Sequence, residues 1–327
     1  MLMPDRRTLL RAGSAAIAVG AAALAPTAPA LARAPQVGKQ AQPGFYRFKL
    51  GTIEITVVSD GTLAFPAETL WGDRAEDARS LLTSTFHHPS SPVGLQINTI
   101  LVNTGDKLVL IDAGCGVDKF QKTTGGLLGN LTAAGYAPAD IDMILFTHCH
   151  FDHLWGISDG KNASLLFPSA EFVASEAEVA FWSDPELPGK VSAKQQPVVT
   201  QTNLKLASPR LRQIKAGADV TPGVSTFDTA GHTPGHMSVH ISSGTEEMLL
   251  TGDVVADPEI GFLHPDWAFG FDLDVPLATK ARIAFLDRAA ADKALVGSYH
   301  LAFPGFGHVV REGSGYRWLP ADWQWTS

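Results

Sequence analysis

Hydrophobic residues along the chain gather in short runs, and most of these runs stop at a glycine or a polar turn. Short apolar runs bounded by turn residues predict β-strands. The strands expected on this ground are 45–50, 53–58, 97–102, 108–111, 141–146, 171–174, 224–228, 238–241, 247–250 and 294–296. Asp60-Gly61 and Thr104-Gly105-Asp106 have the composition of turns between neighbouring strands.

Longer segments between these strands have the composition of helices. Residues 126–134 end at Gly135, and glycine commonly follows the last turn of a helix. Residues 175–182 begin with Ser175 and have Glu178 three positions on, which is the signature of a capped helix start. Residues 276–291 form a third helix. Because strands and helices alternate in both halves without a linker or repeat, we expect one α/β (α+β) domain over 45–327.

The first 32 residues follow a different pattern. Arginines 6 and 7 precede an alanine-rich apolar run over 12–25, and Ala30-Leu31-Ala32 supplies small residues for cleavage. This order predicts a signal peptide, and the paired arginines favour Tat-like export to the periplasm or beyond the cell. An anchoring N-terminal helix is the alternative. Residues 33–44 are read as a lead-in to the folded domain.

Composition narrows the range of partners. The chain is 45% hydrophobic and 18% charged, which is typical of a globular protein. Its net charge of −8 argues against nucleic acid and anionic membranes, since both attract basic patches. The apolar run in the leader is too short to predict a membrane span, and none is expected in the mature chain. Cys115 and Cys149 are too few for a disulfide framework.

A dense group of metal-ligand side chains follows the strand expected at 141–146: His148, His150, Asp152 and His153. Side chains two positions apart in an extended segment share a face, so His148 and His150 can point the same way. Asp152 and His153 lie beyond the turn and can face a second point. Imidazole and carboxylate suit zinc and similar metals. A polar loop with incidental histidines is the alternative, which the density of the group disfavours.

Three more candidate ligands, His232, Asp253 and His300, stand where apolar runs stop. Each one alone would suit a turn or a satisfied polar group. α/β sheets place their sites at strand ends, so all seven residues are expected at one edge of the domain.

These motifs resemble those of the metallo-β-lactamase superfamily. Residues 148–153 match its His-x-His-x-Asp-His signature, and 231–236 match its Gly-His-Thr-x-Gly-His element. The resemblance implies an αββα sandwich of two similar halves with the metal site at one edge. It implies one metal on His148, His150 and His232, and another on Asp152, His153 and His300. Asp253 would lie between the two metals.

Flanking stretches resemble a subgroup of that superfamily, methyl parathion hydrolase with its lactonase and aryl-esterase relatives. They are residues 43–47, 59–62, 101–105 and 303–308. The resemblance is loose over 117–124 and 256–274, where substrate would be contacted. A homodimer is implied by the resemblance alone.

Two divalent ions among five neutral imidazoles and two carboxylates leave excess positive charge, which stabilises a bridging hydroxide near neutral pH. We therefore predict a binuclear metal-dependent hydrolase of apolar (aryl) esters, lactones or organophosphate triesters. Zinc is the expected metal, with manganese, cobalt or iron as alternatives. Asp152, Asp253 and His300 are assigned to the reaction itself.

Aromatic residues indicate a pocket for an apolar group. The residues expected to line it are Phe120, Trp182, Trp267, Phe269 and Phe271. Trp182 suits a helix core equally well. Asp112 is expected to hold a ligand histidine from behind or to be a turn residue. Cys149 is read as a packed thiol, and His236 and His308 as structural or supporting histidines.

Two other functions fit parts of the pattern. A glyoxalase II-like thioester hydrolase shares the ligand set, but no basic cluster for an anionic glutathione arm follows the last ligand. A one-iron dioxygenase or a non-catalytic metal-binding protein is a further alternative, although the one-iron enzymes use fewer ligands than the seven present.

Overall fold

The computed structural model describes residues 44–324 apart from 117–119, 160–163, 192–196 and 258. The expected signal peptide over 1–32 lies outside the described residues, as does nearly all of the lead-in. The elements below belong to a compact unit that runs from Pro43 to Ser327.

The first half of the described chain forms a seven-stranded sheet in the order β1-β2-β3-β4-β5-β6-β7. Its strands are β1 (Phe45–Leu50), β2 (Ile53–Phe65), β3 (Val93–Asn103), β4 (Leu108–Ile111), β5 (Met143–Leu145), β6 (Glu171–Ser175) and β7 (Leu211–Ile214). Its helices are α1 (Ala67–Trp71), α2 (Ala75–Ser84), α3 (Leu127–Ala133), α4 (Phe151–Leu154), α5 (Glu176–Trp182) and α6 (Pro197–Ala207). Strands β1 to β4 pair antiparallel, whereas β4 to β7 are parallel.

The second half forms another seven-stranded sheet, in the order β14-β13-β12-β11-β10-β9-β8. Its strands are β8 (Asp219–Thr221), β9 (Val224–Asp228), β10 (Met237–Ser243), β11 (Glu246–Leu250), β12 (Leu295–Gly297), β13 (Phe306–Glu312) and β14 (Gly315–Pro320). Its helices are α7 (Ile260–Leu263) and α8 (Val275–Asp292). Of the described helices, none is both long and apolar enough to cross a membrane.

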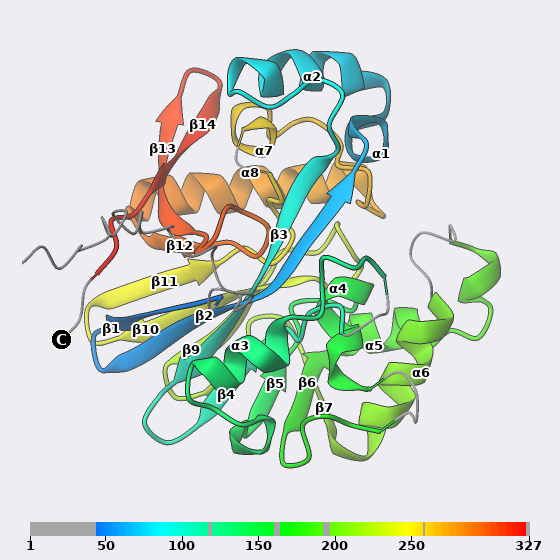
Figure 1. Cartoon of the computed structure of the whole chain (residues 1–327), viewed down its shortest axis with the longest axis vertical. Helices are drawn as coiled ribbons and strands as arrows, with labels where there is room; N and C mark the ends of the chain where they lie inside the picture. The colour runs from blue at the N-terminus through cyan, green and yellow to red at the C-terminus, as the bar shows by residue number, and fades with distance from the viewer. Residues whose placement is uncertain (1–43, 117–119, 160–163, 192–196, 258, 325–327) are drawn as a thin grey trace, which may run out of the picture. The chain divides into compact units, whose positions relative to one another are not determined.

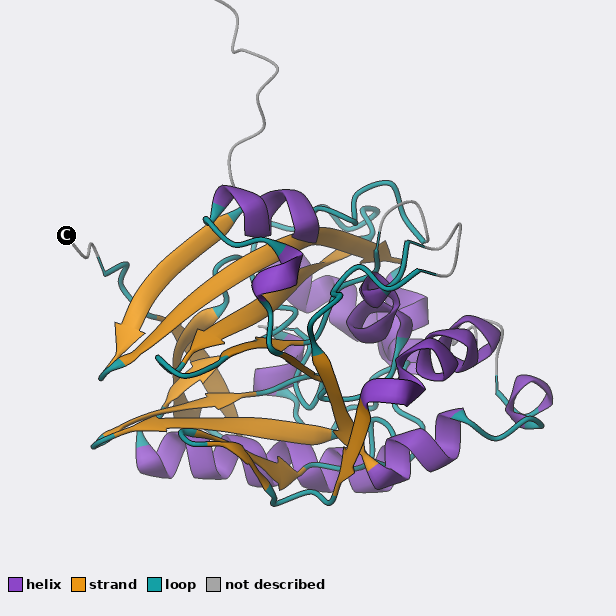
Figure 2. Ribbon diagram, turned by 90° about the horizontal axis from the view of Figure 1, so that it is seen from below, coloured by secondary structure: helices purple, strands orange, loops and turns teal. Residues whose placement is uncertain are grey.

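The two sheets pack face to face on a shared apolar core. Phe48 and Ile55 of the first sheet join Val239 and Ile241 of the second in one buried cluster. Separate apolar clusters lie on the outer faces, one reaching α2, α3 and α5 and the other including Phe285 of α8. Figures 1 and 2 show the sheets between these helices, with α8 along the outer face of the second sheet. This is the αββα sandwich of two similar halves that the resemblance implies.

The prediction of a turn at Asp60-Gly61 is wrong, because β2 continues through these residues with a bulge between Ser59 and Gly61. The bulge turns Asp60 inward, where its carboxylate accepts hydrogen bonds from the backbone N–H groups of Cys115 and Leu127. These contacts satisfy a buried side chain and hold the loop between β4 and α3 against β2. The local turn signal was outweighed by this long-range pairing.

The helices over 67–84 were not predicted from the sequence. Ala75, Ala78 and Leu82 of α2 are buried at a helical spacing, so the signal was present in the sequence. The last hairpin, β13 and β14, was likewise not predicted.

Candidate metal centre

The first ligand loop is positioned by the end of β5 and the start of α4. Asp112 accepts hydrogen bonds from the backbone N–H of Thr147 at 2.8 Å and from its hydroxyl at 2.8 Å. His150 then stands at the N-cap of α4, so His148 and His150 precede the helix while Asp152 and His153 lie on it. All four side chains are buried.

The second half brings its ligands to the same edge from the ends of β9, β11 and β12. Gly231 has a φ of +137°, and a Cβ there would lie 2.2 Å from the backbone nitrogen of Ala278 in α8. Only glycine lets the His232 loop pack this closely on the helix. Asp253 follows β11, and its backbone N–H donates to His236 Nε2 at 2.9 Å.

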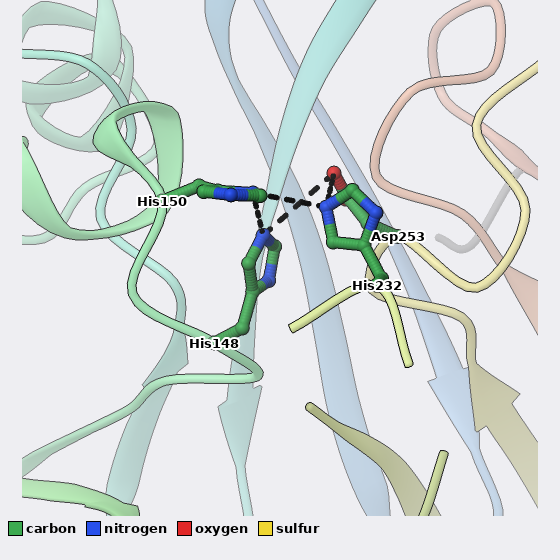
Figure 3. Close-up of side chains that lie close together, drawn as sticks. All are labelled: His148, His150, His232 and Asp253. Carbon is green, nitrogen blue, oxygen red and sulfur yellow. Dashed lines mark hydrogen bonds and ion pairs between the residues drawn. The ribbon is translucent and has the colours of Figure 1, made fainter. Parts of the chain in front are cut away.

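Four of the predicted ligands, His148, His150, His232 and Asp253, form the first group, with ligand atoms within 4.8 Å of one another. His150 Nδ1 lies 3.0 Å from His148 Nε2 and 2.9 Å from His232 Nε2. Asp253 Oδ2 lies 3.3 Å from His232 Nε2. Figure 3 shows the three rings and the carboxylate converging on one point.

The remaining ligands, Asp152, His153 and His300, form a second group within the same limit. Asp152 Oδ2 lies 3.6 Å from His153 Nε2 and 3.4 Å from His300 Nε2. Asp253 joins the two groups, because its Oδ1 is 3.1 Å from His153 Nε2 and its Oδ2 is 3.2 Å from His300 Nε2. The structure thus brings all seven predicted residues together in the division that the resemblance implies.

The buried polar atoms of this cluster fit two cations. Within the described residues, His153 Nε2 and Asp253 Oδ1 are buried and make no hydrogen bond, although they lie 3.1 Å apart. Unpaired buried polar atoms are costly in a folded protein, and a cation among the ligands removes that cost for those that face it. Imidazole nitrogens and carboxylate oxygens are donors for zinc and related ions. The two clusters support a binuclear metal site.

Electrostatics point the same way. Burial alone would lower the pKa of His232, yet Asp253 and Asp272 raise it to about 9. Burial also acts to lower the pKa values of His153 and His300, but the neighbouring carboxylates outweigh it, so both pKa values are raised. The buried carboxylates therefore stabilise positive charge in the cluster, and divalent cations at these positions would supply such charge.

Supporting groups fix the orientation of the ligand histidines. Asp112 Oδ2 lies 2.8 Å from His153 Nδ1, and Asp272 Oδ1 lies 2.9 Å from His232 Nδ1. His300 Nδ1 lies 2.7 Å from the backbone oxygen of Gln96 and donates to it. A proton held at Nδ1 leaves the Nε2 lone pair for a metal. The sequence offered this role for Asp112 beside that of a turn residue, whereas Asp272 and Gln96 carried no signal that pointed to it.

His236 supports the centre without belonging to it. Burial and His232 lower its pKa to about 3, so the ring is neutral. Its Nδ1 lies 2.8 Å from the Thr229 hydroxyl, and its Nε2 accepts the hydrogen bond from Asp253. His308 is an exposed residue of β13 and lies outside the centre.

Glu178 of α5 joins the two ligand loops from behind. Its carboxylate accepts hydrogen bonds from the backbone N–H of Cys149 and of Gly235, each at 2.9 Å. Ser175 caps the same helix by accepting from the Glu178 N–H at 3.0 Å, as the sequence predicts. Cys149 is fully buried among core residues, as is Cys115.

The assignment of Trp182 to the pocket is corrected. Its side chain is fully buried, its indole N–H donates to Glu178 at 2.7 Å, and its ring meets His150 edge-on. Trp182 therefore packs behind a ligand rather than facing substrate. Trp267 is the other tryptophan that was predicted to line the pocket. It stacks on His264 and does not line the cavity described next.

A cavity adjoins the centre. Its lining consists of Leu63, Phe65, Leu95, His150, Phe151, Asp152, Asp253, Phe269, Phe271 and His300. Phe269 and Phe271 were expected there, and Phe120 lies one layer behind, against Phe65 and Phe151. The remaining apolar lining was missed because its residues continue strands or the ligand loop and read as core.

Comparison with known proteins places the chain in a family. A family model described as the metallo-beta-lactamase superfamily matches residues 92–300. An N-acyl homoserine lactonase of Bacillus cereus is 24% identical over 260 residues, which are 74% of this chain and 92% of the relative.

Two solved structures are similar over most of the chain. AidC, a dizinc quorum-quenching lactonase solved with the product N-hexanoyl-L-homoserine, has a TM-score of 0.79 and 30% identity, covering 86% of this chain and 98% of that one. The hydrolase AbOPH has a TM-score of 0.80 and 31% identity, covering 87% of this chain and all of that one. The chain belongs to the metallo-β-lactamase superfamily, and it is a metal-dependent hydrolase. The particular likeness to methyl parathion hydrolase stays a prediction.

Proposed function

We propose that this hydrolase opens lactone rings whose substituent is apolar, as in N-acyl homoserine lactones. The observation that carries the proposal is the cavity, in which six apolar side chains stand beside four of the expected ligands. Burial of an apolar chain against such a wall stabilises binding, while the polar side faces the bond to be cleaved. The Bacillus cereus relative and AidC are lactonases by name.

The proposal extends to aryl esters and organophosphate triesters. Each of these substrates pairs an apolar group with an electrophilic carbonyl or phosphoryl centre, so the same wall and ligand edge serve all of them. The flanking stretches that resemble methyl parathion hydrolase support this wider range.

The residues of the centre have different roles in the proposed reaction. Bound divalent cations would polarise the substrate oxygen and lower the pKa of water, and zinc is the first ion to test. Asp253 spans both ligand groups and fixes their separation. Asp152 lines the cavity with its Oδ2 toward His153 and His300, so its carboxylate can take a proton from water and return it to the leaving oxygen.

The test is metal content together with hydrolysis of a panel by the purified protein. The panel holds N-hexanoyl homoserine lactone, dihydrocoumarin, an aryl acetate, methyl parathion and lactoylglutathione. We expect two metals per chain and lactone opening that a chelator abolishes and zinc, manganese, cobalt or iron restores. His232→Ala should lose metal and activity, whereas His308→Ala, an exposed histidine, should keep both.

Other results would contradict the proposal. Cleavage confined to lactoylglutathione would favour a glyoxalase II-like thioesterase. One iron per chain without hydrolysis would favour a dioxygenase or a non-catalytic metal-binding protein.

Export and assembly are further proposals that rest on the sequence alone. The arginine pair and the small residues near 30–32 support a Tat-like signal peptide and a periplasmic or secreted mature chain. Fractionation of cells, with Arg6→Lys and Arg7→Lys together as the export-blocking variant, tests this. Light scattering on the mature protein tests the homodimer.

A further inference from the structure

Arg282 is a buried arginine in the middle of α8, with 3% of its surface exposed. Its guanidinium donates to the backbone oxygens of Val254 at 2.9 Å, Pro265 at 3.1 Å and Trp267 at 2.9 Å. A further N–H donates to Asp272 Oδ2 at 2.8 Å. A single side chain thus fastens Val254 and three points of the segment 265–272 to one helix, and only a planar fork of donors can serve them together.

Asp272 carries the connection from Arg282 to the metal centre. Its Oδ2 also accepts the backbone N–H of Phe269 at 3.2 Å, while its Oδ1 faces His232 Nδ1 at 2.9 Å. The backbone N–H of Leu273 donates to the backbone oxygen of His232 at 3.0 Å. Both oxygens of one carboxylate are therefore occupied, one by a ligand histidine and the other by the segment and its arginine.

Two aromatic residues that precede this carboxylate in the chain line the cavity. Phe269 precedes Asp272 by three positions and Phe271 by one, and both rings belong to the apolar wall. Their rings pack on each other at 5.8 Å, and Phe271 meets Phe65 of β2 edge-on at 5.1 Å. The position of this wall is set by a segment whose hydrogen bonds end on Arg282.

We propose that Arg282 and Asp272 are positioning residues that hold the apolar wall of Phe269 and Phe271 in register with the metal ligand His232. Arg282 sets the path of the segment, and Asp272 orients both the wall and the imidazole. The position of the apolar group of a substrate and the orientation of a metal ligand are consequently determined by one ion pair. The part that concerns substrate rests on the proposed lactonase function.

Three full-chain variants test the proposal. Arg282→Lys keeps the positive charge but cannot reach four acceptors. Asp272→Asn keeps the shape but offers an N–H where His232 Nδ1 needs an acceptor. Arg288→Lys is the matched control, because Arg288 lies on the same helix and pairs with Asp292 near the surface. Zinc affinity is measured by chelator competition, and KM and kcat are measured for lactones with short and long acyl chains.

We expect Asp272→Asn to weaken zinc binding by roughly 10- to 100-fold, as is usual when a carboxylate behind a ligand histidine is lost. Arg282→Lys should weaken zinc binding about threefold or more and raise KM for the long-chain lactone about tenfold, equivalent to ~1.4 kcal/mol, with a smaller change for the short chain and in kcat. Arg288→Lys should match the parent. If Arg282→Lys does not fold, the zinc affinity of Asp272→Asn decides.

Zinc affinities of Asp272→Asn and Arg282→Lys equal to that of Arg288→Lys would overturn the inference. So would a KM that rises equally for every chain length in Arg282→Lys. The zinc measurement needs no substrate, so a parent protein inactive on all lactones would refute the proposed function while leaving this inference to be judged on metal binding.

Discussion

At the scale of single residues, the centre depends on hydrogen bonds that fix where protons sit on the ligand histidines. Asp112 and Asp272 hold Nδ1 of His153 and His232, so the opposite nitrogens face the cluster. Such carboxylates act through the ligand and not on substrate.

Asp112→Asn tests this at His153. Loss of the carboxylate should weaken metal binding by roughly 10- to 100-fold, because the amide no longer favours the proton at Nδ1. Chelator competition measures the affinity. Asp106→Asn, in an exposed turn, is the control and should bind metal as the parent does. An unchanged affinity in Asp112→Asn would contradict the role assigned here.

The aromatic wall gives a second residue-scale prediction. Phe271→Ala removes a ring from the cavity and should lower kcat/KM for long-chain or aryl substrates by roughly tenfold or more, the equivalent of one lost apolar contact. Trp267→Ala is a matched comparison, since that ring lies outside the lining. Equal losses in both variants would mean that the wall does not bind the apolar group.

At the scale of elements, carboxylates inside the fold hold helices and loops in place. Glu178 ties α5 to both ligand loops, and Asp257 accepts the backbone N–H groups of Glu259 and Ile260 at the start of α7. Both groups are buried, and in both cases burial raises the pKa.

Glu178→Gln should destabilise the protein by about 1–3 kcal/mol, because an amide N–H would face backbone and indole donors that need an acceptor. Thermal unfolding with and without zinc measures the loss. Glu176→Gln, an exposed position on the same helix, should leave the melting temperature unchanged. Equal melting temperatures for the two variants would show that the Glu178 contacts contribute little.

Asp257 predicts a pH dependence of stability. Burial raises its pKa from 3.8 to about 7, so between these values the folded protein holds a proton that the unfolded chain releases. Its contribution to stability therefore falls as pH rises from about 4 to 7. Asp257→Asn should remove this fall and be more stable than the parent at pH 8 by on the order of 1 kcal/mol or more, with little difference at pH 4.

Denaturant unfolding across this pH range measures the difference between Asp257→Asn and the parent. Asp266→Asn, an exposed position in the same segment, is the control and should follow the parent curve. A parent and an Asp257→Asn variant with parallel curves would contradict the assignment.

At the scale of the whole molecule, the centre joins the two halves. His148, His150, Asp152 and His153 come from the first half, whereas His232, Asp253 and His300 come from the second. A ligand that binds only the folded state stabilises it by mass action, and here that state includes the packing of both halves.

Metal removal should therefore lower the melting temperature of the protein. At free zinc about a thousandfold above its dissociation constant, binding contributes ~4 kcal/mol, which corresponds to a fall on the order of 10 °C on chelation. Scanning calorimetry before and after chelation, and again after zinc is restored, measures it. A melting temperature insensitive to chelator would show that the metals do not brace the two halves.

Much of this arrangement could be predicted from the sequence. The apolar runs place most central strands within a residue or two. The histidine motif, with the three candidates at the ends of other apolar runs, names all seven residues that the structure brings together. The predictions that failed rested on the composition of a few neighbouring residues. Asp60-Gly61 reads as a turn, yet β2 runs through it because Asp60 finds partners more than fifty residues away.

The sequence by itself determined the family, the ligand set and the alternation of strands and helices. Each of these depends on residue types at short separations along the chain. Only the tertiary structure decided which aromatic residues face the cavity and which carboxylates stand behind the ligands. Trp182 is buried behind His150, and Asp272 meets His232 across forty residues. Such contacts depend on how α8 and the loops pack on the sheets, and no spacing within the chain encodes that packing.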